Sequence, residues 1–230
     1  IQLENPECRY TDDSVLTMAV AEACLGDKNY AKALKHWSRK YPRAGYGGMF
    51  LDWFLGASNA PYNSYGNGSA MRVSSVGWLF KTLDETLDEA KRSAEVTHNH
   101  PEGIKGAQSV AGAIFMGRTG KSKEEIREWI KRLFGYDLDR CIQDIRPGYA
   151  FDATCQGSVP EAIIAFLESN GFEDALRLAI SLGGDTDTIA CITGSMAEAF
   201  YGGVPESLWA FAKSKLDPDM LAVVERFINR

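Results

Sequence analysis

The chain has 230 residues, of which 45% are hydrophobic and 24% are charged, and its formal net charge is −6 at pH 7. A chain of this length and composition buries enough apolar surface to fold without disulfides, and it is unlike disordered sequences. No apolar run reaches the roughly 18 residues that a membrane-spanning helix needs. The acidic balance argues against binding of bare nucleic acid, which requires a concentrated basic face.

The cysteines indicate a reducing compartment. There are five of them, widely spaced and without a Cys-x-x-Cys pair, so neither a disulfide framework nor a thiolate zinc site is expected. No signal peptide or transit segment is visible, and we expect a cytoplasmic protein with reduced thiols. The sequence opens at Ile1 rather than at a methionine, which leaves open whether its natural beginning was lost or removed.

Apolar residues recur at the i, i+3, i+4, i+7 spacing of amphipathic helices through most of the chain. Ser122 with Glu125, and Ser158 with Glu161, form capping-box sequences at the start of two such segments. In chain order, the expected helices cover residues 15–25, 30–41, 83–94, 101–115, 122–133, 158–167, 172–179, 189–200 and 221–228. No segment alternates with a period of two, and no linker or internal repeat divides the chain. We therefore predict an all-α fold with one compact multi-helix domain over residues 1–230.

Three segments rich in Gly, Asp, Asn and Tyr interrupt this helical pattern, at residues 9–14, 56–72 and 183–188. In a helical protein, loops of this composition are where functional groups tend to lie. These three segments therefore hold candidate binding and catalytic residues.

Two of the interruptions are acidic. Thr11–Asp13 directly precedes an expected helix, and capping of that helix explains it when it is taken alone. The second cluster, Asp185–Thr188, follows two glycines and precedes another helix. One carboxylate suffices to cap a helix, whereas adjacent carboxylates repel one another unless a cation neutralises them. Brought together, the two clusters would suit Mg²⁺ or Mn²⁺, which prefer carboxylate and hydroxyl oxygens, and Gly183 and Gly184 would let the backbone approach a ligand closely.

The third interruption contains the sequence Tyr65-Gly-Asn-Gly-Ser-Ala-Met-Arg72. Gly66 and Gly68 free the backbone to direct amide N–H groups at an anion such as phosphate, and a helix is expected just after them. Arg72 would either add positive charge or support the loop from below. A simple connecting turn is the alternative, because Gly and Asn are common turn residues.

His98 and His100 lie between two expected helices, with a spacing that does not suit zinc on a helix. They are either a helix-linking pair or polar contacts to a sugar or phosphate. Tyr149 and Phe151 would either stack on a nucleobase or pack in the core.

Taken together, these motifs resemble those of the ADP-ribosylglycohydrolase family, the relatives of the hydrolase that removes ADP-ribose from dinitrogenase reductase. The likeness covers nearly the whole chain, in order. Arg9–Glu22 is similar to the family's first metal segment, Ser64–Val73 to its phosphate loop and Thr97-His98 to its histidine turn. Leu182–Ala190 is the most specific of these matches.

The resemblance implies a compact all-helical domain with a two-metal centre, usually of Mg²⁺ or Mn²⁺, at the bottom of a cleft. One ion would be held by Thr11, Asp12, Asp13 and Asp187, and the second by Asp185, Asp187 and Thr188. The ions would bind the diol of the distal ribose and a water near its anomeric carbon. Asp12 or Asp13 would orient or deprotonate that water, which attacks as the glycosidic bond breaks.

The resemblance also implies that the Gly-Asn-Gly loop receives the diphosphate, that His98 borders the distal ribose, and that Tyr149 or Phe151 stacks on adenine. The residues expected to contact the substrate are Gly66, Asn67, Gly68, Ser69, Met71, Arg72, His98, Tyr149 and Phe151.

One feature departs from the family pattern. Family members normally begin with a helix that carries Gly-Asp-x-x-Gly and a glutamate reaching the metal centre, and this chain shows no counterpart. Two hypotheses therefore stay open: a hydrolase that cleaves ADP-ribose from a protein, a nucleic acid or a small molecule, and a non-catalytic ADP-ribose-binding or structural relative. The complete acidic motifs favour the enzyme. The choice of linkage is expected to lie in loops around the cleft, chiefly Tyr41–Tyr62.

Overall fold

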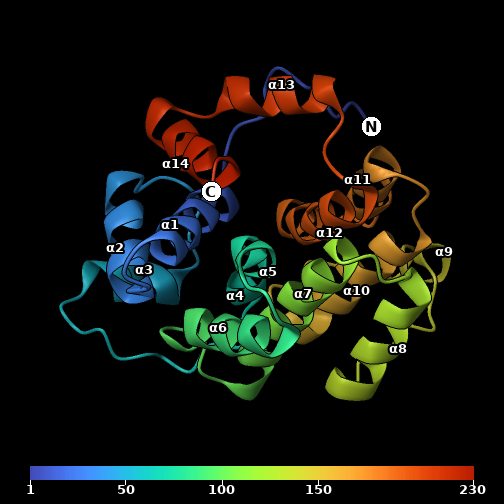
Figure 1. The fold of residues 1–230 in the computed structure, drawn as a ribbon, viewed down its shortest axis with the longest axis horizontal. Helices are drawn as coiled ribbons and strands as arrows, with labels where there is room; N and C mark the ends of the chain where they lie inside the picture. The colour runs from blue at the N-terminus through green and yellow to red at the C-terminus, as the bar shows by residue number, and fades with distance from the viewer.

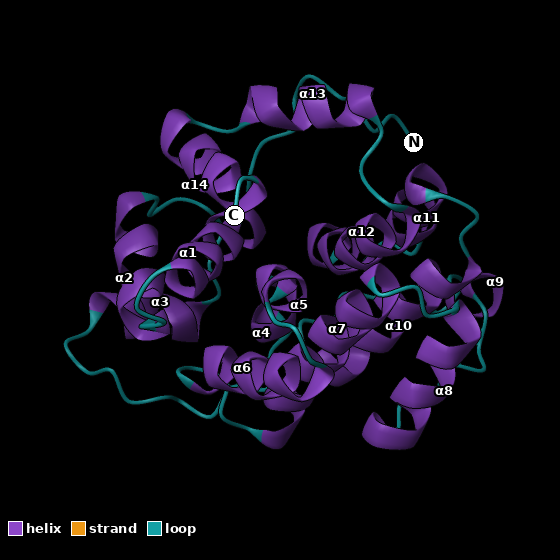
Figure 2. Ribbon diagram, viewed as in Figure 1, coloured by secondary structure: helices purple, strands orange, loops and turns teal.

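The computed structural model describes residues 1–230 and is built of helices joined by loops, with no strand (Figures 1 and 2). The helices are α1 (Asp12–Leu25), α2 (Tyr30–Lys40), α3 (Gly48–Leu55), α4 (Gly68–Met71), α5 (Ser74–Leu79), α6 (Leu83–Glu95), α7 (Pro101–Arg118), α8 (Lys123–Phe134), α9 (Ile142–Ile145), α10 (Cys155–Glu168), α11 (Phe172–Ser181), α12 (Thr186–Tyr201), α13 (Glu206–Lys215) and α14 (Pro218–Ile228). The prediction of an all-α fold is confirmed.

The buried apolar side chains form one continuous cluster that draws on helices from α1 to α14. Figure 1 shows α7 near the middle of the molecule, with α6 on one side of it, α8 and α10 on the other, and α12 also packed against it. α13 lies along one edge and contains no buried residue. None of the helices is long and apolar enough to cross a membrane.

Each helix expected from the periodicity is present, but several boundaries differ. α1 and α12 begin at Asp12 and Thr186, inside the acidic clusters rather than after them. The Tyr41–Tyr62 stretch, expected as loops, contains the short helix α3. Its hydrophobic residues face both the core and solvent, because Phe50 and Phe54 are buried whereas Leu55 is exposed, so no one-sided pattern marked it as a helix.

The predicted capping box at Ser158 is wrong. α10 begins earlier, because the Thr154 hydroxyl accepts a hydrogen bond from the Gly157 amide at 3.1 Å and caps the helix there. Ser158 then lies inside the helix, where its hydroxyl donates to the Thr154 carbonyl at 2.6 Å. Pro160 is accommodated within the helix. At Ser122, by contrast, both hydrogen bonds of the capping box are present, as predicted.

The start of α1, the short helix α4 and the start of α12 meet around Met71. The Met71 carbonyl lies 3.4 Å from the Thr17 hydroxyl of α1 and 3.4 Å from the Cys191 thiol of α12. This junction brings the two acidic clusters, which are far apart in the sequence, to the same region of the fold.

Glycines on α7 permit very close helix packing. A Cβ atom placed on Gly112 would lie 2.2 Å from Cη2 of Trp129 on α8, and one on Gly106 would lie 2.4 Å from Sγ of Cys155 on α10. Real side chains do not approach so closely, so α7 can hold both neighbours only with glycine at these positions.

We expect Gly112→Ala to destabilise the protein by about 1–3 kcal/mol, the usual cost of overpacking a core. The sign of the change in the free energy of unfolding distinguishes a tightly packed site from an open one, because Gly→Ala at an open helical site stabilises a protein by about 1 kcal/mol. The free energy of unfolding in urea is the measurement. The control is Gly48→Ala in the first turn of α3, an exposed helical position where a Cβ atom would meet nothing within 4 Å. A Gly112→Ala protein as stable as the control would contradict the packing.

Candidate active site

A cleft of about 570 Å³ contains residues from both acidic clusters. Asp12 lines it from the start of α1, and Asp185, Asp187 and Thr188 line it from the start of α12. The remaining lining comes from the Gly45–Phe50 segment, from residues 62–72, from His98 and from residues 151–154. The acidic clusters predicted to act together therefore share one cleft.

Four aspartates, Asp12, Asp13, Asp185 and Asp187, form what we call the carboxylate cluster. The pKa of Asp12 is raised to about 6, chiefly by burial and also by the nearby Asp187 and Asp185 carboxylates, against the opposing effect of a backbone hydrogen bond. Burial also raises the pKa of Asp13 to about 7, assisted by the charges of Asp187 and Asp12. For Asp185, burial is again the main cause of a raised pKa, opposed by a hydrogen bond from Asn67. Gathering these acids thus costs free energy.

Helix capping does not explain the acidic residues. Thr11 and Asp185 occupy the N-cap positions of α1 and α12, yet neither side chain makes a capping hydrogen bond. The Thr11 hydroxyl instead donates to Oδ2 of Asp13 at 2.9 Å. Asp12, Asp185 and Asp187 line the cleft, whereas Asp13 is buried behind it.

The donor set fits a hard divalent cation. Asp13 is 5% exposed, and its Oδ1 atom is buried without a hydrogen-bond partner, which is costly unless a ligand compensates. No three His, Cys, Asp or Glu side chains are gathered closely enough to hold a metal by themselves, although the charges of these acids act on one another's pKa. A cation here would therefore need additional oxygens from Thr11, Thr188, water or a bound substrate. Mg²⁺ and Mn²⁺ commonly bind in this way.

Gly66–Ser69, here called the glycine loop, lies against residues 153–155. The Asn67 amide donates to the Ala153 carbonyl at 2.8 Å, and the Cys155 amide donates to the Tyr65 carbonyl at 2.9 Å. The Ser69 side chain is fully buried and donates to the Gly103 carbonyl, so only its backbone remains for a ligand. Met71 is also buried and lines the cleft.

Arg72 supports the loop from beneath and is fully buried. Its Nη2 donates to the Ser93 carbonyl at 3.1 Å and to the Thr97 hydroxyl at 2.8 Å. Its Nε and Nη1 atoms have no partner, and no carboxylate pairs with it. A buried cation without a counter-charge is unfavourable, so an anion bound in this cleft would stabilise it.

His98 is connected to Arg72 through the Thr97 hydroxyl, which contacts both side chains. Its Nδ1 is 2.7 Å from the Thr97 hydroxyl, and burial lowers its pKa well below the usual value, with Arg72 adding to the effect. Because the Thr97 oxygen accepts from Arg72, its own proton is free to be donated to Nδ1 of the neutral ring. The ring proton is then on Nε2, which lies beside Gly68 in the cleft wall.

The two candidate stacking residues differ in position. Phe151 is 70% exposed and lines the cleft at its rim. Tyr149 is not among the lining residues of the cleft; it donates from its hydroxyl to the Gly157 carbonyl at 3.0 Å. A Cβ atom on Gly184 would lie 2.7 Å from the Tyr149 ring. Gly184 therefore gives room to this tyrosine, rather than to a ligand as expected.

Several lining residues were not predicted individually. Gly45, Met49 and Tyr62 belong to the Tyr41–Tyr62 stretch that was expected around the cleft, whereas Thr154 was not expected there. Gly45 lies closest to the carboxylate cluster, because a Cβ atom there would be 3.5 Å from Oδ1 of Asp12. The only sequence signal for this wall is the glycine-rich run of residues 45–48. Tyr62 and Thr154 reach the cleft through long-range packing that no local pattern reveals.

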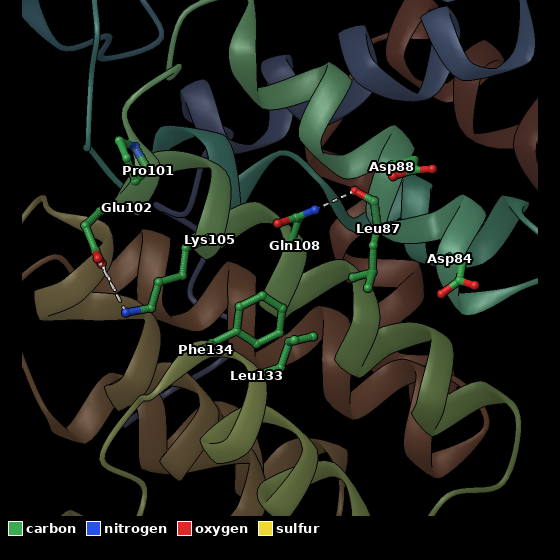
Figure 3. Close-up of a pocket in the computed structure, with 9 residues that line it drawn as sticks. All are labelled: Asp84, Leu87, Asp88, Pro101, Glu102, Lys105, Gln108, Leu133 and Phe134. Atoms are coloured by element: carbon green, nitrogen blue, oxygen red, sulfur yellow. Dashed lines mark hydrogen bonds and ion pairs between the residues drawn. The ribbon is translucent and has the colours of Figure 1, made fainter.

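A larger cavity of about 720 Å³ lies elsewhere, between α6, α7 and α8 (Figure 3). Its polar groups are partly used within the chain: Lys105 pairs with Glu102 at 3.3 Å, and Gln108 donates to the Leu87 carbonyl at 3.0 Å. None of the predicted site residues lines it. The smaller cleft is therefore the candidate active site.

The raised pKa of Asp13 predicts a pH-dependent stability in metal-free buffer. The folded chain binds this proton more tightly than the unfolded chain, so the stabilisation is present at low pH and is lost as pH rises toward 7. Between pH 5 and 8 this group should remove about 2–3 kcal/mol from the free energy of unfolding. Asp13→Asn should abolish that part of the slope in chemical unfolding with EDTA. Equal slopes in both proteins would contradict the buried, acid-surrounded position.

Comparisons with known proteins identify the family to which the chain belongs. The family model described as ADP-ribosylglycohydrolase matches residues 3–229. Human ADP-ribosylhydrolase ARH3 is 28% identical over 281 residues, covering 93% of this chain and 77% of the relative. ADP-ribosylarginine hydrolase Tri1 of Pseudomonas putida (strain GB-1) is 27% identical over 229 residues, covering 85% of this chain and 60% of the relative.

Among solved structures, one described as an ADP-ribosylglycohydrolase-related protein complex matches with a TM-score of 0.71 and 25% identity, covering 93% of this chain and 78% of the other. The family match extends over almost the whole chain, and the fold agrees with it. The chain therefore belongs to the ADP-ribosylglycohydrolase family of hydrolases.

Proposed function

We propose that this chain is a divalent-metal-dependent hydrolase that releases ADP-ribose from a modified substrate by cleaving the glycosidic bond at the distal ribose. The names of its relatives, an ADP-ribosylhydrolase and an ADP-ribosylarginine hydrolase, support this class of substrate. Two ions, Mg²⁺ or Mn²⁺, are proposed to bind among Thr11, Asp12, Asp13, Asp185, Asp187 and Thr188.

One observation carries the proposal. The cleft contains two places where charged groups of the protein lack a counter-charge, and the missing charge is positive at one place and negative at the other. The carboxylate cluster needs a cation, because Asp13 is buried and Asp12 half-buried beside the charge of Asp187. Arg72 needs an anion, because its buried guanidinium has no acidic partner. ADP-ribose offers a diphosphate for the glycine loop and Arg72, and ribose hydroxyls for cations held by the carboxylates.

The chain's own groups suit glycosidic cleavage. This reaction passes through an oxocarbenium-like state, which nearby carboxylates stabilise and which a positioned water captures. Bound cations would supply Lewis acidity for the ribose hydroxyls and the water. Asp12 lines the cleft, and a carboxylate with a pKa near 6 can accept a proton at neutral pH. We propose that Asp12 or Asp13 orients or deprotonates the water, and that Nε2–H of His98 donates to the distal ribose.

Asp187→Asn should lower turnover by more than about 100-fold, because loss of a metal-binding carboxylate removes both metal affinity and water activation. The measurement is the release of ADP-ribose from a panel of ADP-ribosylated arginine, serine and nucleotide substrates. The matched control is Asp84→Asn, an exposed acid in the other cavity, which should leave rates unchanged. Wild-type rates in Asp187→Asn would refute the role of this carboxylate.

The same panel, with and without EDTA, tests the dependence on metal. Chelation should abolish release, and added Mg²⁺ or Mn²⁺ should restore it. Calorimetry with ADP-ribose and Mg²⁺ completes the test, because binding without any release would favour the non-catalytic alternative. Undiminished release in EDTA would overturn the metal requirement itself.

A further inference from the structure

Asn67 belongs to the glycine loop, but its side chain forms hydrogen bonds with two residues outside that loop. It is 6% exposed. Its Nδ2 donates to Oδ2 of Asp185 at 2.7 Å and to the Ser158 hydroxyl at 3.1 Å. The amide thus connects the glycine loop to the carboxylate cluster and to α10.

The surrounding hydrogen bonds fix the orientation of this amide. The single Ser158 hydroxyl proton is donated to the Thr154 carbonyl at 2.6 Å, so the Ser158 oxygen can only accept from Asn67. The Asp185 carboxylate also accepts. Both neighbours therefore require the NH₂ group, and the reverse amide orientation would leave two acceptors facing a carbonyl oxygen. The Asn67 backbone is held independently by the Ala153 carbonyl at 2.8 Å.

Asp185 depends on this contact for its orientation. It stands at the N-cap of α12 but makes no capping hydrogen bond, and Asn67 donates a hydrogen bond of 2.7 Å to one of its carboxylate oxygens. A donated hydrogen bond to one carboxylate oxygen limits rotation and leaves the other oxygen for a cation. Such supporting contacts commonly change metal affinity about 10–100-fold when removed.

We propose that Asn67 is a positioning residue, which holds the Asp185 carboxylate in the orientation that divalent-cation binding requires and so couples the glycine loop to the metal centre. This inference rests on the proposed function, because it presumes that the carboxylate cluster binds the cation.

The test is Mn²⁺ binding to the full chain without substrate, measured by the electron paramagnetic resonance signal of free Mn²⁺. Asn67→Ala should weaken binding about 10–100-fold. Asn67→Leu, which keeps most of the volume but donates nothing, should do the same. Ser158→Ala removes the other partner of the amide and should change the affinity less than about 3-fold. Unfolding temperatures in EDTA establish that each variant is folded.

A double-mutant cycle with Asp185→Asn separates positioning from general support of the loop. With the carboxylate replaced, Asn67 has no anion to orient, so Asn67→Ala should then change Mn²⁺ affinity less than about 3-fold. The inference is overturned if Asn67→Ala binds Mn²⁺ like wild type, or if its loss is equally large in both backgrounds. A wild-type chain that binds no Mn²⁺ would instead refute the proposed metal centre.

Discussion

Repulsion among like charges in a half-buried cleft is the constraint on which the rest of this site depends. The charge of Asp187 acts on Asp12 and Asp13, and burial already disfavours the ionised form of these two acids. A fold gains nothing in stability from such an arrangement. Its persistence is explained when a cation joins the carboxylates, because the same geometry that raises their pKa values then becomes favourable for binding.

The fold around the carboxylate cluster brings its acidic residues together. α1 and α12 approach through the Met71 carbonyl of α4, so the short helix that follows the glycine loop also sets the spacing of the acidic clusters. Beneath it, Arg72, Thr97 and His98 form a buried polar chain from a guanidinium to an imidazole. One element thus connects the proposed cation site with the proposed diphosphate site.

Much of this could be predicted from the sequence, for identifiable physical reasons. Helical periodicity is local, so segments such as α6 and α8 were predicted, and the cap of α8 was predicted as well. The two acidic clusters were visible because paired carboxylates exceed what capping needs. The start of α10 could not be predicted from the sequence. Two hydroxyl residues, Thr154 and Ser158, could each cap this helix, and only the packing of the fold decides between them. The contacts of Tyr149 with Gly184 and of Asn67 with Asp185 depend on segments distant in sequence, which no local pattern reports.

The most direct test of the account is a crystal structure of the chain grown with Mn²⁺ and ADP-ribose, with anomalous diffraction measured at the manganese edge. The account predicts anomalous peaks between the carboxylates of α1 and α12, with the diphosphate against the glycine loop and the distal ribose beside the peaks. Well-ordered ADP-ribose without manganese among Asp12, Asp13, Asp185 and Asp187, or manganese bound only elsewhere, would contradict it.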